Sequence, residues 1–76
     1  MEYPDFTVYD LCEGFNDYMS ECEANLRAQG VTVTLDVEKQ LATDILWDFG
    51  TIPDGMSTGR YKCAVINAVQ KHFTMN

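Results

Sequence analysis

Carboxylates spaced four residues apart are the groups in this chain best suited by type and spacing to do chemistry. Such pairs occur at Glu13/Asp17, Asp17/Glu21 and Asp44/Asp48. Side chains four apart share one face of a helix, and two carboxylates that face each other across a cleft can act as general acid and general base. Each of these pairs is expected on an outer helical face, so the spacing does not favour acid–base catalysis.

The other reactive residue types are too sparse to predict a catalytic or metal site. His72 is the single histidine, and no GxSxG motif accompanies it. Residues 55–60 lack the glycine spacing of a phosphate-binding loop and read as a turn followed by a helix N-cap. No CxxC, HxxxH or calcium-loop spacing is present. We therefore expect a protein without catalytic residues, metal or cofactor.

Cysteine usage and hydropathy indicate the compartment. The chain has three cysteines, and Cys12 and Cys22 lie about 15 Å apart along one predicted helix, too far for a disulfide. An odd number of thiols predicted to be buried is typical of a reducing compartment. The N-terminus has no basic segment followed by an apolar one, and no apolar run is long enough for a bilayer. A cytoplasmic protein with no membrane role is expected, in the host cytoplasm if a phage encodes it.

Charge is distributed unevenly along the 76 residues. Residues 1–54 carry all twelve acids and two cations, which gives 2 − 12 = −10, whereas residues 55–76 carry three cations and no acid, for a total of −7. This balance argues against direct binding to nucleic acid or anionic membranes and favours a basic partner surface.

Apolar periodicity predicts a long first helix over residues 7–29. Thr7 is its expected N-cap, with Asp10 completing a capping box, and Asp5 is the other candidate N-cap. Gly30 is the expected C-cap. Gly14 would lie inside this helix at a cost of about 1 kcal/mol relative to alanine, either simply tolerated or allowing something external to approach closely. The buried stripe would consist of Val8, Leu11, Cys12, Phe15, Met19, Cys22 and Leu26.

Two further helices are predicted over 36–49 and 58–73, which makes the expected fold an all-α, single-domain, three-helix bundle. Asp36 is the expected N-cap of the second helix, and Gly50 its end. Residues 31–35 alternate apolar and hydroxyl side chains, which predicts an extended connector or, alternatively, a minor β-element. The expected inner faces are Val37, Leu41, Ala42, Ile45, Leu46 and Phe49, then Tyr61, Ala64, Val65, Ala68, Val69 and Phe73.

Acids form a second stripe on the first predicted helix, opposite the apolar one. Like charges four apart each cost about 0.2–0.5 kcal/mol in a helix, and no lysine or arginine is interleaved. Four charges over about 16 Å are sparser than the one per about 1.7 Å of duplex DNA, so an imitation of DNA would need further acids or a second copy. The stripe is either a solubilising surface or an attraction for a basic site, and consists of Asp10, Glu13, Asp17 and Glu21.

Trp47 falls on the polar side of the second predicted helix, beside Gln40, Thr43 and Asp44. Tryptophan is among the commonest interface anchors, and an exposed Trp47 near Asp44 and Asp48 would suit that role. The alternative is that Trp47 closes the bundle against the loop that contains Pro53.

These observations favour a non-catalytic inhibitor that binds a basic, nucleic-acid-binding type of site on a protein or protein–nucleic-acid complex, as a monomer or a homodimer. In size and composition the chain resembles phage-encoded anti-defence proteins, such as anti-restriction and anti-CRISPR inhibitors, although no motif carries that resemblance. The alternative is an assembly subunit that packs through its C-terminal helix, where Ile66 and Cys63 widen the apolar face. The expected partner-binding residues are Asp10, Glu13, Asp17, Glu21, Asp44, Trp47 and Asp48.

Overall fold

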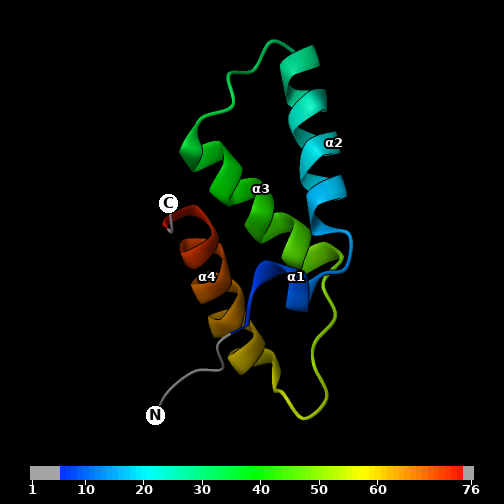
Figure 1. Cartoon of the computed structure of the whole chain (residues 1–76), viewed down its shortest axis with the longest axis vertical. Coiled ribbons are helices and arrows are strands. Elements are labelled where there is room, and N and C mark those ends of the chain that lie inside the picture. The colour runs from blue at the N-terminus through cyan, green and yellow to red at the C-terminus, as the bar shows by residue number, and fades with distance from the viewer. Residues whose placement is uncertain (1–5, 75–76) are drawn as a thin grey trace.

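The computed structural model describes residues 6–74, and its secondary structure is entirely helical there (Figure 1). Its elements are α1 (Val8–Leu11), α2 (Phe15–Ala28), α3 (Leu35–Asp48) and α4 (Thr58–Thr74). The predicted all-α fold class is confirmed, and α2, α3 and α4 pack as a three-helix bundle. Residues 31–34 are an extended connector with no strand partner among the described residues.

The predicted first helix is in fact two helices, and Gly14 separates them. Cys12 is extended (φ −148°, ψ 109°) and Gly14 is left-handed (φ 79°), so α1 ends at Leu11 and α2 begins at Phe15. Glycine adopts a positive φ without the steric cost that a Cβ brings. The prediction of one continuous helix over residues 7–29 is wrong, because apolar periodicity persists across a break when both helices face the same core.

The predicted N-cap, Thr7, is confirmed, whereas Asp5, the other candidate, lies outside the described residues. The predicted C-cap is one residue too far along the chain, because Gln29 is the C-cap of α2 and Gly30 follows it. Thr7 Oγ1 accepts a hydrogen bond from the Asp10 amide at 3.2 Å, and Asp10 Oδ2 accepts one from the Thr7 amide at 3.0 Å, which forms the capping box. At the other end Gly30 is left-handed (φ 84°), and the Val31 amide donates to the Leu26 carbonyl at 3.0 Å. This hydrogen bond, which spans five residues, is the one expected in the Schellman motif of helix termination.

The N-cap of α3 differs from the prediction. Thr34, rather than Asp36, accepts a hydrogen bond from the Val37 amide at 3.3 Å. Asp36 lies in the first turn, where its carboxylate faces the positive end of the helix. Both residues suit a helix start, so sequence alone did not separate the cap from the first-turn acid.

The core lies where α1, α4, the first half of α2 and the second half of α3 meet (Figure 1). In α4 the predicted inner face is buried except for Phe73, which is half-buried. In α3, Val37 and Leu41 are only half-buried, and the prediction that Phe49 is a core residue is wrong because its side chain is 56% exposed. The buried residues are Val8, Leu11, Cys12, Phe15, Met19, Ala42, Ile45, Leu46, Tyr61, Ala64, Val65, Ala68 and Val69.

The ends of α1 and α3 and the start of α4 meet around Gly50. The buried Tyr61 hydroxyl donates a hydrogen bond to the Leu46 carbonyl, and the Thr51 amide donates to the Leu11 carbonyl at 3.0 Å. A Cβ at position 50 would lie 2.1 Å from Tyr61 Oη and 2.3 Å from the Leu46 oxygen. Only glycine therefore fits between the three helices at this junction.

We predict that Gly50→Ala lowers the free energy of unfolding by about 2 kcal/mol, because the added methyl overpacks the junction and displaces the Tyr61 hydroxyl. Urea unfolding followed by the fluorescence of Trp47, whose ring contacts Tyr61, measures the change. Gly59→Ala is the matched control, because a Cβ there has no atom within 4 Å. It should be neutral or stabilise by up to about 1 kcal/mol. Equal effects of the two substitutions would contradict a steric role for Gly50.

Candidate protein-binding site

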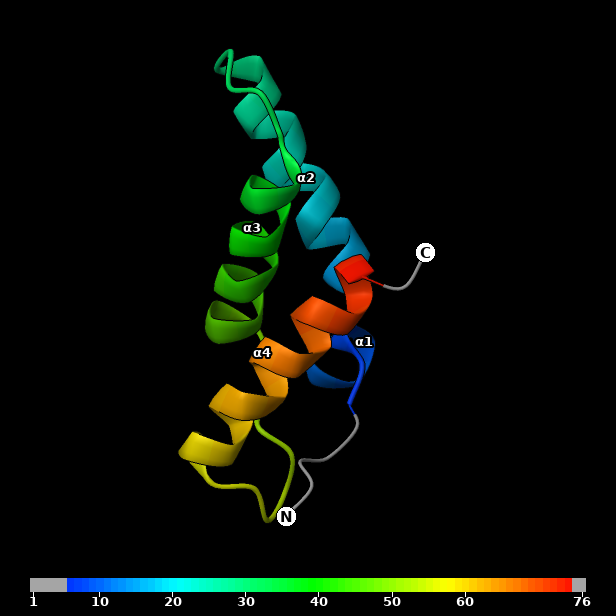
Figure 2. The same cartoon turned by 90° about the vertical axis from the view of Figure 1, so that its left-hand side faces the viewer.

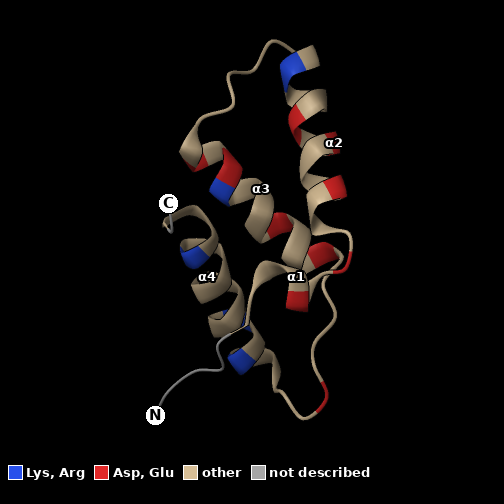
Figure 3. Cartoon of the chain, in the orientation of Figure 1, with Lys and Arg blue, Asp and Glu red and all other residues tan. Residues whose placement is uncertain are grey.

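All six acids predicted to bind a partner are exposed, and they lie on α1, the α1–α2 connection, α2 and α3. In Figure 3, acids mark α1, α2, α3 and the loops after α1 and α3. Arg27 lies among them on α2 and Lys39 on α3, whereas the residues coloured as charged on α4 are all basic. The structure thus keeps the charge asymmetry of the sequence as a spatial one. The six are Asp10 in α1, Glu13 in the α1–α2 connection, Asp17 and Glu21 in α2, and Asp44 and Asp48 in α3.

An aromatic stack brings the acidic parts of α2 and α3 together. The rings of Tyr18 and Phe49 lie 4.5 Å apart and within 10° of parallel. Asp17 directly precedes Tyr18, and Asp48 directly precedes Phe49, so each partner of the stack has a carboxylate on the neighbouring backbone position. We call the surface around this stack the acidic end, formed by Asp10, Glu13, Asp17, Asp44 and Asp48; Glu21 lies one turn farther along α2.

Within residues 6–74, none of these carboxylates forms an ion pair. The break at Gly14 also removes one predicted repulsion, because Glu13 does not share a helix with Asp17. Asp44 and Asp48 do share α3, and they lie towards its negative end with no basic residue in the last turn. A like-charge pair costs about 0.2–0.5 kcal/mol, and an acid at a helix C-terminus about 0.3–1 kcal/mol. The acidic end therefore lowers the stability of the fold.

Two of the acids have hydrogen-bond partners. Asp44 Oδ1 accepts from Gln40 Nε2 at 3.0 Å, on the exposed face of α3. Asp10 Oδ2 accepts from both the amide and the hydroxyl of Thr7, each at 3.0 Å, and these bonds hold the pKa of Asp10 below its usual value. Asp10 thus caps α1 and also contributes negative charge to the surface.

Trp47 and Phe49, the residues before and after Asp48 in the sequence, are both exposed aromatic side chains. The Trp47 ring is 43% exposed and meets the buried Tyr61 ring edge to face, with centroids 5.8 Å apart. Phe49 is held by its stack on Tyr18. Sequence reasoning missed Phe49, because apolar periodicity assigned it to the core although it is the C-cap of α3. No sequence signal identified its partner.

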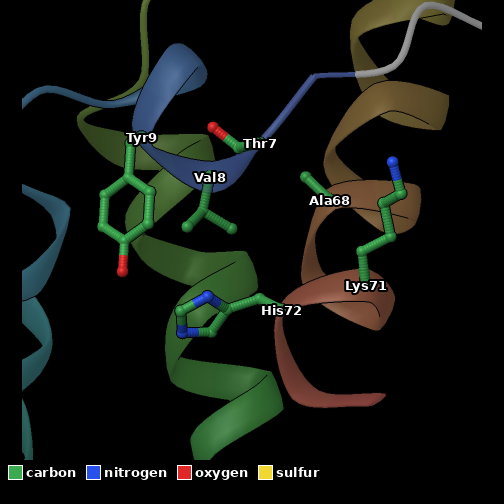
Figure 4. A pocket seen from close by; sticks show the side chains of 6 residues that line it. All are labelled: Thr7, Val8, Tyr9, Ala68, Lys71 and His72. Carbon is green, nitrogen blue, oxygen red and sulfur yellow. The ribbon is translucent and has the colours of Figure 1, made fainter. Parts of the chain in front are cut away.

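A surface cavity of about 420 Å³ lies between α1 and the C-terminal half of α4 (Figure 4). The His72 ring packs edge to face against Tyr9 at 5.9 Å. The Thr7 hydroxyl donates to Asp10, and the Tyr9 hydroxyl donates to Asn16, so both hydroxyl protons in the cavity are engaged. This arrangement gives His72 a packing role. The lining consists of Thr7, Val8, Tyr9, Ala68, Lys71 and His72.

Comparisons with known proteins found no relative of this chain. No family model matches it, and no curated protein or solved structure shows significant similarity to it. Among the residues that the structure describes, no group of His, Cys, Asp and Glu is arranged to hold a metal ion. None of the described helices combines the length and the hydropathy needed to cross a bilayer.

The capping box predicts how stability depends on pH. Because the pKa of Asp10 is lowered in the folded state, its contribution is complete above the unfolded value of about 3.9 and is lost as pH falls through the folded value. In an NMR titration, Thr7→Ala should raise the pKa of Asp10 only part of the way towards its ordinary value, because the hydrogen bond from the backbone amide of residue 7 to the Asp10 carboxylate remains. Asp10→Asn should flatten the acid limb of the stability curve. An Asp10 pKa that Thr7→Ala leaves unchanged would contradict this account.

Proposed function

We propose that this protein is a small, non-catalytic inhibitor that binds a basic site of another protein through its acidic end. The observation that carries the proposal is a group of exposed carboxylates on α1, α2 and α3, together with two exposed aromatic side chains at the end of α3, with no described cation paired to the carboxylates. A Lys- and Arg-rich surface complements this arrangement in charge. Surfaces that hold DNA or RNA have that composition.

Electrostatic cost supports a role in binding rather than in solubility alone. A solubilising surface usually mixes both signs of charge, whereas the C-terminal half of α3 carries Asp44 and Asp48 without a compensating base. Residues that oppose the helix dipole and repel each other reduce stability. A basic partner would reduce both the repulsion and the unfavourable dipole interaction in the complex. The free energy of binding becomes more favourable by that amount.

The exposed aromatic rings supply what charge alone does not. Arginine stacks on aromatic faces while its guanidinium group pairs with carboxylates. The Phe49 ring, already stacked on Tyr18 and preceded by Asp48, offers both features within one short segment. Trp47, fixed against Tyr61, is a second rigid anchor of the type that dominates interface energies.

The class of inhibitor proposed is the phage anti-defence type, with the host cytoplasm as its place of action. Size, net charge of −7 and an acidic surface support this class. The proposed target is a protein or a protein–nucleic-acid complex whose nucleic-acid-binding site the acidic end covers. The chain itself binds neither nucleic acid nor membrane in this proposal, because its charge repels both.

A second candidate function is that of an assembly subunit that packs through α4. Ile66 favours it, since this aliphatic side chain is 46% exposed on α4, and Cys63 nearby is half-buried. Under this alternative, changes at Ile66 would disrupt a complex and changes at the acidic end would not.

The test starts with capture of the target from native host lysate at low and high salt. The partner should elute as salt rises, because exposed charges are screened. With the captured target, Asp17→Lys/Asp48→Lys should weaken binding by about tenfold or more. The same double variant should not lose stability, because the lysine at position 48 complements the negative end of α3.

Asp54→Lys/Asn67→Lys/Gln70→Lys is the matched control, because it changes net charge equally at exposed positions outside the acidic end. Its binding should weaken much less. If the test and control variants lose affinity equally, net charge rather than a defined site drives association. If neither loses affinity, the acidic end is not the binding surface.

A further inference from the structure

Residues 23–40 form an arm that lacks a core of its own. The α2–α3 hairpin extends beyond the end of α4 (Figure 2), and none of residues 20–41 is buried. Cys22 and Leu41 are the last hairpin residues that pack against the core. Beyond them Leu26, Val33 and Val37 are half-buried, while Val31 and Leu35 are 41% and 52% exposed.

Such an arm is energetically incomplete. Short helices are marginal in water and owe their stability mainly to packing of an apolar face. In the arm, α2 and α3 cover each other on one side only, because α4 does not reach them (Figure 2). A third layer would complete the burial of the apolar residues on both helices.

The charge of the arm indicates what kind of surface could cover it. The arm contains Arg27 and Lys39, the two cations of residues 1–54, together with three acids, so its charge is 2 − 3 = −1. The remaining nine of the twelve acids lie outside it with no cation among them in residues 1–54. A basic target is therefore attracted to the acidic end, whereas a surface that carries both signs complements a copy of itself.

We propose that the arm binds the arm of a second copy of this chain, in a two-fold symmetric homodimer. In an isologous contact each residue of one patch faces the same patch on the other copy. Val31 and Leu35 of each copy are then covered by the apolar face of the other. Lys39 and Asp36, one helical turn apart, pair across the two-fold axis.

The size of the arm can be compared with that of a standard interface. A standard interface covers about 800 Å² of each partner, which is about 15% of the 5226 Å² accessible surface of this chain. The arm supplies 18 of the 76 residues. Pairing through the arms leaves the residues of both acidic ends outside the contact.

The test is sedimentation equilibrium of the full chain under reducing conditions. Wild type should approach twice the monomer mass of 8.6 kDa. Leu35→Asn should raise the dimer dissociation constant by about tenfold or more, because each dimer loses two apolar contacts. Ile66→Asn is the matched control, because Ile66 is a similarly exposed aliphatic residue on α4. Its substitution should change the dimer dissociation constant less than about twofold.

A wild-type measurement keeps the test independent of any variant's folding. On dilution, amide chemical shifts should change within the arm and not in α4 or the acidic end. A mass of 8.6 kDa up to millimolar concentration would overturn the proposal, as would dissociation by Ile66→Asn instead of Leu35→Asn. Neither outcome bears on target binding, which is measured separately through the acidic end.

Discussion

The hydrogen bond from the Tyr61 hydroxyl to the Leu46 carbonyl is the interaction on which the arrangement of this molecule depends. It satisfies a carbonyl near the end of α3 and joins α3 to the start of α4. Gly50 leaves the space for it, and the Thr51 amide extends the junction to the end of α1. A buried polar pair of this kind is costly if broken. Together with the bond from Thr51 to Leu11, it holds α1, α3 and α4 in one relative position.

The same junction places the candidate binding groups. Trp47 rests on Tyr61 itself, and Phe49 follows on the opposite side of Asp48, stacked on Tyr18. The aromatic rings of the acidic end are thus held by core contacts and need little ordering on binding. Preorganised groups lose less conformational entropy when a partner binds. Rigid anchors among exposed carboxylates are consistent with the proposed inhibitor.

Because the protein is small, the distribution of charge has a large effect on its stability. A chain of 76 residues has a stability of only a few kcal/mol, so repulsion at the acidic end is a substantial fraction of it. The described core is compact and confined to one half of the molecule, while the arm is left without cover. The acidic end and the arm therefore differ in both charge and packing, and the two proposals assign them separate partners.

Sequence by itself determined the all-α fold class, the bounds of α3 and α4 to within a residue, the Thr7 capping box, the turn at Gly30 and the separation of acids from the basic α4. These features depend on interactions within about four residues, which periodicity and capping patterns record. Tertiary structure alone decided the break at Gly14, the exposure of Phe49, its stack on Tyr18 and the uncovered arm. Each of these follows from contacts between segments distant in the chain, or from a backbone conformation that residue spacing does not encode.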